Sequence, residues 1–421
     1  MKKISLLIVF SFLISIISAQ ELVKSYYYSD SYGILPKSPL EIEKNIIIPF
    51  SITKNKEKKA GILYLNKDNS IKDAVLFEGK NNYVINEIIE SENGNLLISA
   101  EGYSDQGQES LYFIELNKSS IVNDFIFNED GNELDPFAIL EIEENILIGG
   151  FVKRRELVSS SFYNMYSEKQ MIYIAEFTKK GRKIWSKGIN LEGYENGICN
   201  QMIKQDKEII LLCHANKVGE EMAPILIKID LQGNVKKIVE IKESNSIVIG
   251  SKIENRNNEI SLVGSYSKNK NYLINYVFNK DLELIEGSEY IMPEKILINY
   301  FEDNIILGGI LKDNNYNNLM ISMHNNSCTI NIFGSKKTDM LIGKTEENVL
   351  GYRIGNEKDV MSSLKIFKDL SSSLFIDKQK SNLFINDQIK YNIETEFIKS
   401  SINTGVSKVK TKNVLDKFIE L

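Results

Sequence analysis

The most constraining feature of this sequence is a short apolar motif that recurs seven times. Each copy begins with an asparagine or a glutamate followed by an aliphatic run, as in Asn95-Leu-Leu-Ile-Ser-Ala. The copies start at Asn45, Asn95, Asn145, Glu208, Glu259, Asn304 and Asn348. Five of the six spacings lie between 44 and 51 residues, and the third is 63. Self-similarity at this period indicates an array of equivalent supersecondary units.

A polar turn follows each motif at a nearly constant distance, which supports the repeat independently. The turns are marked by Asn66, Asn117, Thr178, Asp230, Asn279, Asn325 and Asp369. Six of them lie 20 to 22 residues after the start of their motif, whereas the third lies 33 residues after it. The excess predicts an insertion in the third unit, between Val152 and Met171.

Residues 83–127 illustrate the content of one unit. Four runs rich in β-branched and aromatic residues are separated by turns containing Gly, Asn and Ser. Such runs are typical of strands and hairpins, and inner runs that are almost wholly apolar fit sheets covered on both faces. Four antiparallel strands per unit, repeated seven times, predict an all-β fold: a β-propeller of seven four-stranded blades, with six or eight blades as alternatives.

The repeats resemble those of secreted bacterial β-propeller proteins with degenerate blade motifs. Residues 145–150 and 304–309 fit the aliphatic-Gly-Gly half of that motif. Lys228-Ile-Asp-Leu-Gln-Gly and Gly181-Arg-Lys-Ile-Trp fit its second half. The resemblance spans roughly residues 37–377 and implies the fold only, because propellers serve enzymes, receptors and scaffolds alike.

The two ends of the chain differ from the repeats. Lys2 and Lys3 precede an apolar run that ends at Ser18-Ala19, so residues 1–19 are expected to be a secretory signal peptide. The propeller is assigned to residues 20–377, and Leu22–Tyr28 is expected to add a strand to the last blade. Residues 378–421 are expected to form either a closing strand or a tail. The protein is therefore expected to be exported, as a periplasmic, cell-surface or extracellular protein without a transmembrane segment.

Three cysteines and two histidines limit the chemistry. Cys199 and Cys213 face each other if the hairpin turns at Asp206, so a disulfide between them is predicted, with two small buried residues as the alternative. His214 and His324 fall near opposite faces and have no ligand partners at metal spacing, so no metal site is expected. No cofactor motif is found, and a net charge of −6 argues against a nucleic-acid partner.

Two features remain as candidates for a binding site. The insertion concentrates basic and aromatic residues of the types common in recognition sites: Arg154, Arg155, Phe162, Tyr163 and Tyr166. Loops on the same face carry Glu129, Asp130, Glu133, Asp135, Glu192, Glu195, Glu220 and Glu221. The alternatives are an insertion that packs on a neighbouring blade and carboxylates that are merely solvated.

These observations predict a non-catalytic, secreted protein. We expect an exported, monomeric binding module that recognises a protein or a glycan through one face. The alternative is a glycoside hydrolase or lyase that uses two loop carboxylates as its acid and base.

Overall fold

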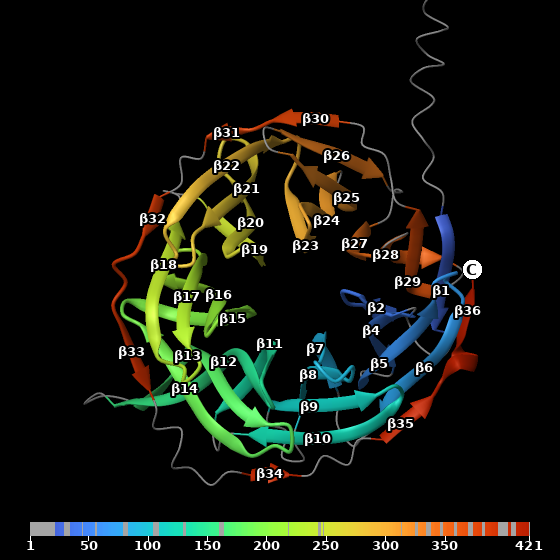
Figure 1. Cartoon of the computed structure of the whole chain (residues 1–421), viewed down its shortest axis with the longest axis horizontal. Coiled ribbons are helices and arrows are strands. Elements are labelled where there is room, and N and C mark those ends of the chain that lie inside the picture. Colours follow the sequence, from blue (N-terminus) through green and yellow to red (C-terminus); the bar gives the residue numbers. More distant parts are fainter. Residues whose placement is uncertain are drawn as a thin grey trace, which may run out of the picture.

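The chain folds into a ring of seven antiparallel β-sheets, as the repeat predicted (Figure 1). The computed structural model describes residues 22–420 except 29–33, 44, 55–56, 79–82, 104–108, 129–131, 160–163, 218, 243–245, 247, 313, 325–326, 334–337, 346–347, 358–359, 369–373, 381–383, 395–402 and 406–409. The predicted signal peptide therefore lies outside the described residues.

Blades 1 to 6 each take their four strands from one repeat, numbered from the centre outwards, and consecutive strands pair. Blade 1 contains β2 (Ile34–Pro36), β3 (Leu40–Ile42), β4 (Asn45–Lys54), β5 (Glu57–Asn66) and β6 (Ile71–Glu78). Blade 2 contains β7 (Tyr83–Glu90), β8 (Leu96–Tyr103), β9 (Glu109–Asn117) and β10 (Ser120–Asn128). Blade 3 contains β11 (Glu133–Ile142), β12 (Asn145–Ser159), β13 (Asn164–Thr178) and β14 (Lys183–Leu191). In blade 1 the first strand is divided into β2 and β3, which both pair with β4.

The remaining blades follow the same order. Blades 4 to 7 contain β15 (Tyr194–Gln205), β16 (Glu208–Lys217), β17 (Ala223–Asp230) and β18 (Val235–Lys242); β19 (Val248–Arg256), β20 (Glu259–Ser267), β21 (Asn271–Phe278) and β22 (Leu284–Met292); β23 (Ile296–Glu302), β24 (Ile305–Lys312), β25 (Asn315–Met323) and β26 (Ser327–Phe333); β27 (Thr338–Lys344), β28 (Asn348–Glu357) and β29 (Val360–Lys368). The fourth strand of blade 7 is β1 (Leu22–Tyr28), which pairs with β29 and confirms the predicted closure.

The repeated apolar motif forms the second strand of every blade because both faces of that strand are buried. In β4, Ile46 and Ile48 pack between blades 7 and 1, whereas Ile47 packs between blades 1 and 2. Successive side chains of a strand point to opposite faces, so a continuous aliphatic run supplies two interfaces at once. One apolar cluster of this kind lies at each of the seven junctions between described blades.

The glycines of the motif have a steric cause in the neighbouring first strand. A Cβ at Gly150, Gly264 or Gly308 would lie 2.0, 2.2 or 1.9 Å from a carbonyl oxygen of that strand. In each of these blades the first strand has a register shift at this level, typical of a β-bulge. The bulge brings the carbonyl towards the second strand, and only glycine leaves room for it.

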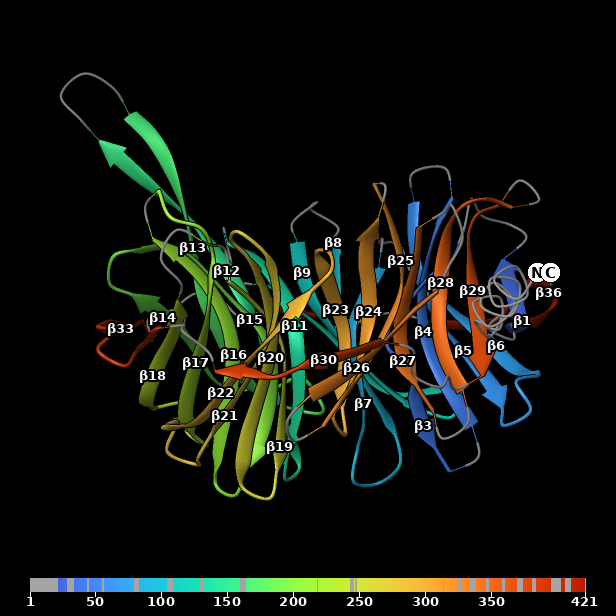
Figure 2. The same ribbon diagram turned by 90° about the horizontal axis from the view of Figure 1, so that it is seen from above.

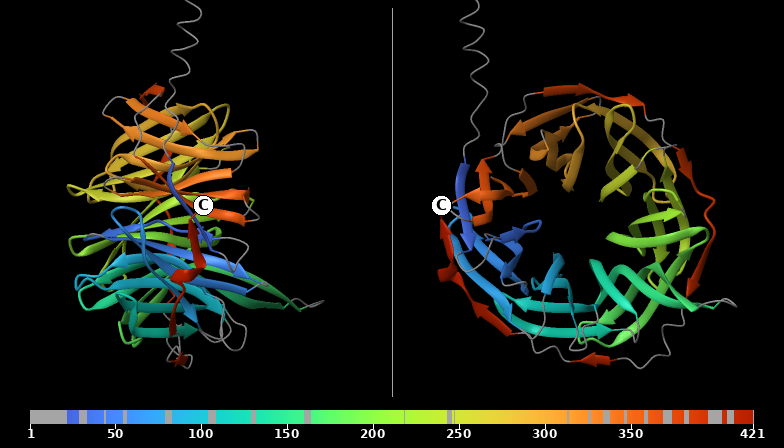
Figure 3. Two further views of the ribbon diagram at one scale, coloured as in Figure 1. Left: turned by 90° about the vertical axis from the view of Figure 1, so that its right-hand side faces the viewer. Right: turned by 180° about the vertical axis from the view of Figure 1, so that it is seen from behind.

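A C-terminal belt surrounds the ring (Figures 1 and 3). We use this name for the strands β30 (Leu374–Asp377), β31 (Gln379–Lys380), β32 (Phe384–Asn386), β33 (Tyr391–Glu394), β34 (Asn403–Gly405), β35 (Lys410–Asn413) and β36 (Phe418–Glu420). They pair in that order with blades 6, 5, 4, 3, 2, 1 and 7, each as a fifth, outermost strand. The belt thus runs around the ring against the direction in which the blades follow one another.

The belt is fixed to the ring most firmly at its end. Val414 and Phe418 are buried in the cluster between blades 7 and 1, on either side of a 3₁₀ turn at Leu415–Lys417. The ring of Phe418 lies edge-on to Phe50, with centroids 5.3 Å apart. Because β36 pairs with β1, the N-terminal strand is held between β29 and the end of the belt. Both ends of the described chain therefore close the same blade.

Candidate functional site

The predicted insertion in blade 3 is a long two-stranded ribbon that projects from one face of the ring (Figure 2). Its strands β12 and β13 pair continuously from Asn145↔Thr178 to Ser159↔Asn164. The neighbouring strand β11 pairs with β12 only as far as Lys153, and β14 pairs with β13 only as far as Ile172. We call residues 154–169 the arm, and the face from which it projects the arm face.

The structure places only some of the predicted arm residues. Arg154 and Arg155 lie on β12 and Tyr166 lies on β13, opposite Leu157, but their side chains are outside the described part of the structure. Phe162 and Tyr163 lie outside the described residues altogether. The strand register therefore places Arg154, Arg155 and Tyr166 on one projecting hairpin.

The base of the arm is joined to the ring by specific contacts. Lys153 Nζ lies 3.2 Å from Glu133 Oε2 on β11 and 5.4 Å from the centre of the Phe151 ring. In blade 4, the Tyr194 ring packs under Lys217 Nζ at 4.9 Å. Burial, followed by the nearby Glu240 carboxylate, raises the pKa of Tyr194. The Tyr194 phenol consequently stays neutral and acts as a packing element between blades 3 and 4.

The carboxylates predicted on the arm face have different surroundings. Glu195, at the start of β15, is exposed to solvent, and Asp130 lies outside the described residues. Glu220 is bound to Lys242, and this hydrogen bond lowers the pKa of the Glu220 carboxyl group. A glycosidase needs one carboxyl group whose pKa is raised so that it can donate a proton. Glu220 has the opposite shift, so the hydrolase alternative is not favoured.

A shallow depression opens on the arm face where blade 5 meets blade 6. It has a volume of about 90 Å³ and is lined by Ile249, Ser265, Tyr266, Ser267, Asn271, Tyr272, Lys295 and Ile296. The rings of Tyr266 and Tyr272 are stacked at 4.6 Å with an interplanar angle of 10°. Sequence reasoning missed this site because its residues come from four separate strands and a loop. Two tyrosines six residues apart carry no recognisable signal.

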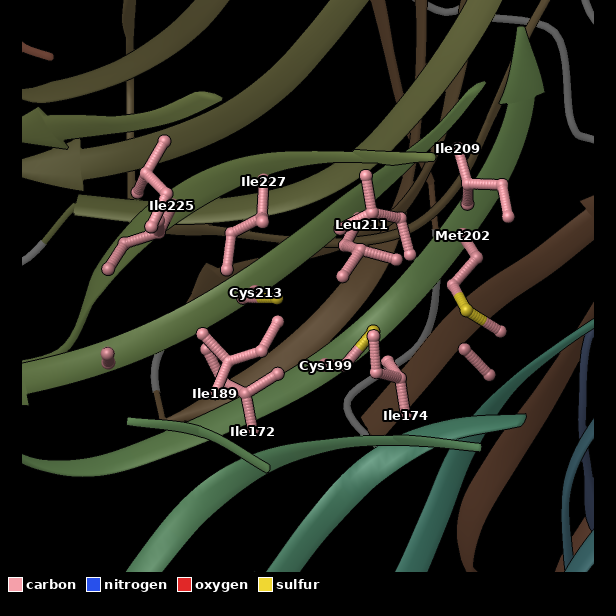
Figure 4. Close-up of a cluster of buried hydrophobic side chains, with 14 of the residues drawn as sticks. Ile172, Ile174, Ile189, Cys199, Met202, Ile209, Leu211, Cys213, Ile225 and Ile227 are labelled. Atoms are coloured by element: carbon pink, nitrogen blue, oxygen red, sulfur yellow. The ribbon is translucent and has the colours of Figure 1, made fainter. Parts of the chain in front are cut away.

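Cys199 and Cys213 occupy directly opposed positions on β15 and β16, in the register that the sequence predicted. Both are free, buried thiols within the cluster between blades 3 and 4 (Figure 4). Burial raises the pKa of the Cys213 thiol, and a hydrogen bond with Cys199 adds to the effect. The disulfide itself stays a prediction. Cys328 is also buried, and burial raises its pKa to about 12.

His214 has a structural role near the C-terminal end of β16 in blade 4. Its Nδ1 lies 2.6 Å from Asn200 Oδ1, and burial lowers its pKa to about 4. No group of three or more His, Cys, Asp or Glu residues that could hold a metal ion occurs in the described part of the chain. In the same residues, no helix is long and apolar enough to cross a membrane.

The sequence matches no protein-family model and no curated protein. The function must therefore be inferred from the geometry described above.

Proposed function

We propose that this protein is an exported binding module that captures a protein partner through the arm. The observation that carries the proposal is the unpaired backbone of the ribbon. Among the described residues, β12 beyond Lys153 and β13 before Ile172 pair only with each other. Both outer edges of the arm therefore present backbone donors and acceptors to which a strand of another protein can add.

The energetics of the arm support the same role. A two-stranded ribbon with no third strand is marginally stable in water. The ring does not need the arm, because the six other blades are built without an equivalent extension. A segment that leaves the core, with two arginines at its base and three aromatic residues further along its sequence, is best explained by a partner that covers it.

A matched pair of cross-linking variants tests this proposal. A photoreactive phenylalanine analogue replaces Tyr166 in the arm or, as a control, Ile285 on β22, which is 54% exposed and lies away from the arm face. We expect one discrete protein adduct from the arm position and none from the control. The adduct should be suppressed by an excess of the unlabelled protein, but not by an excess of a variant in which a two-residue Asn-Gly turn replaces residues 154–169. Equal labelling from both positions would contradict the proposal.

A glycan ligand is the second candidate, and the tyrosine-lined depression favours it. Stacked aromatic rings beside Ser267, Asn271 and Lys295 combine an apolar surface with hydrogen-bonding groups, as sugar recognition requires. In a glycan array, binding that is lost in Tyr272→Ala but kept after removal of the arm would support this candidate. Binding that requires the arm would instead favour the protein partner.

Export forms part of the proposal and rests on the charged and apolar character of residues 1–19. Sequencing the N-terminus of protein recovered outside the cytoplasm should give Gln20 as the first residue. Recovery only from the cytoplasm, with an intact N-terminus, would remove export from the proposal.

A further inference from the structure

Side chains of the innermost strands link neighbouring blades to one another. These strands, among them β7, β11, β15 and β19, surround the centre of the ring in Figure 1. At the junction of blades 4 and 5, Gln201 of β15 bonds to the backbone of Ile253 on β19. The Oε1 atom of Gln201 accepts from Ile253 N at 2.9 Å, and its Nε2 atom donates to Ile253 O at 3.0 Å. One amide therefore satisfies both backbone groups of one residue in the next blade.

Glu87 occupies the position of Gln201 at the junction of blades 2 and 3. Each is opposed to the fourth residue after the start of its repeat motif, which is Ser99 for Glu87 and Leu212 for Gln201. Each also follows a register shift typical of a β-bulge. The backbone nitrogen of Ile139, in blade 3, donates to Glu87 Oε2 at 2.7 Å. The two junctions are thus built alike, with glutamate in one and glutamine in the other.

The exchange of glutamine for glutamate changes what the backbone carbonyl of the next blade meets. Ile139 and Ile253 are equivalent, because each is opposed to the third residue after the start of its motif. An approach by Glu87 like that of Gln201 directs its second carboxyl oxygen towards Ile139 O. An ionised carboxylate has acceptors only, whereas a neutral carboxyl group can donate through its O–H. The neutral acid therefore reproduces both bonds, and the ionised form sets two acceptors against each other.

The surroundings of Glu87 favour the neutral form. Side chains alternate between the faces of a strand, so Ser99, like Leu97, faces the cluster between blades 2 and 3. Ser99 is fully buried, and its hydroxyl oxygen has no hydrogen-bond partner among the described residues. Burial raises the pKa of Glu87 to about 7, although the bond from Ile139 N and the attraction of Lys252 act in the opposite direction.

The charges around Glu87 only partly offset its burial. Lys252, on β19, is the cation whose attraction lowers the pKa of Glu87. The carboxylates nearest to it in register are Glu101 on β8 and Glu141 on β11, and Glu141 is bound by Lys179 at 2.5 Å. Most of the charged residues on the strands packed against β7 are acidic. They are Glu41 on β3, Lys54 on β4, Glu57, Lys58 and Lys59 on β5, Glu101 on β8, and Glu133, Asp135 and Glu141 on β11.

We propose that Glu87 makes the junction between blades 2 and 3 a pH-dependent latch. The neutral carboxyl group closes the junction with two hydrogen bonds to Ile139, as Gln201 does with Ile253, and ionisation sets the carboxylate against the Ile139 carbonyl. The latch weakens as the pH rises, because the folded protein binds the proton of Glu87 more tightly than the unfolded chain does. Strand β11 also pairs with β12, which continues into the arm, so the latch acts on the blade that carries the arm.

Urea unfolding of Glu87→Gln and of the unmodified protein at pH 5 and pH 8 tests the latch. Folding raises the pKa of Glu87 from 4.5 to about 7, so this residue should increase the unfolding equilibrium constant on the order of a hundredfold between these pH values. Glu87→Gln should lack this increase, because its amide makes both bonds at either pH. Comparing the two proteins cancels other titrating groups such as His214. Glu294→Gln is the matched control, since Glu294 is exposed, and it should keep the increase.

The reciprocal variant Gln201→Glu gives an independent test. It should transfer the latch to the junction of blades 4 and 5, and so be destabilised more at pH 8 than at pH 5. Hydrogen exchange, corrected for its intrinsic pH dependence, gives a local readout. The protection of β11 should fall between pH 6 and pH 8 in the unmodified protein but not in Glu87→Gln.

Three outcomes would overturn the latch. The first is a Glu87→Gln variant that does not fold, because a neutral side chain of the same shape should close the junction. The second is a Glu87→Gln variant that keeps the increase in the unfolding constant between pH 5 and pH 8. The third is a Gln201→Glu variant that is destabilised equally at both pH values. None of these measurements involves binding by the arm, so the test is independent of the proposed function.

Discussion

Replacing Phe418 with alanine should destabilise the whole ring, although this residue lies only three positions from the end of the chain. Phe418 is 8% exposed and packs edge-on against Phe50 in the cluster between blades 7 and 1. Removing a buried phenylalanine side chain typically costs 3–5 kcal/mol, and a site near a chain end relaxes more than a central one. We therefore expect a loss of about 3 kcal/mol in the free energy of unfolding.

Urea unfolding followed by circular dichroism measures this loss, and Leu415→Ala supplies the control. Leu415 lies in the same 3₁₀ turn but is 39% exposed, so its truncation should cost less than about 1 kcal/mol. The midpoint of Phe418→Ala should fall while the slope of the transition stays unchanged. Equal midpoints for the two variants would show that the end of the belt is not part of the cooperative unit, and would refute the reasoning.

Three further predictions follow from individual contacts. In protein recovered from an oxidising compartment, Cys199 and Cys213 should resist alkylation after denaturation without reductant; labelling of both would exclude the disulfide. Gly233→Ala should cost more stability than Gly94→Ala. Both glycines have positive φ, near +73° and +78°, but only at Gly233 would a Cβ meet another side chain, at 2.6 Å. Thermal unfolding compares the two variants, and equal losses of stability would contradict the packing argument. Burial keeps the pKa of His214 at about 4 in the native state, whereas the unfolded chain protonates near 6.5, so the free energy of unfolding should fall by about 3 kcal/mol as the pH drops across that window. His214→Gln should make the free energy of unfolding less dependent on pH. An unchanged dependence would rule out His214 as its cause.

Local patterns predicted the blades because their signals repeat. The second strands were recognisable from aliphatic runs, since each buries both faces, and the turns at Asp230 and Asn279 recurred for a local reason. In both turns the side-chain oxygen accepts backbone hydrogen bonds from residues two and four positions later. Leu22–Tyr28 was recognisable as the missing strand because the last repeat supplies only three.

The belt could not be derived in the same way. Its strands contain two to four residues each, too few to show an alternating pattern, and each pairs with a different blade. The pairing order depends on the ring already being closed, which is information that no local segment contains. For residues 378–421 the sequence therefore left two alternatives open.

The candidate sites differ in the same way, because some are marked by a local sequence pattern and others form only in the closed ring. The arm was predictable because its residues interrupt the repeat of about 50 residues. The strand register then showed that the outer edges of the arm are unpaired. The tyrosine-lined depression had no signal, because Tyr266, Tyr272 and Lys295 come from separate strands and a loop that meet only in the folded ring. Opposed positions such as Cys199 and Cys213 were predictable since they belong to one hairpin.

Engineered disulfides between the belt and the blades test the circular architecture most directly. Opposed positions in an antiparallel pair lie within disulfide range. Lys242→Cys with Phe384→Cys joins the belt to blade 4, and Asn128→Cys with Asn403→Cys joins it to blade 2. Both pairs should oxidise within one molecule, whereas the exchanged pair Lys242→Cys with Asn403→Cys should not. Cross-linking of the exchanged pair, or failure of both matched pairs, would contradict a closed ring encircled by its own C-terminal segment.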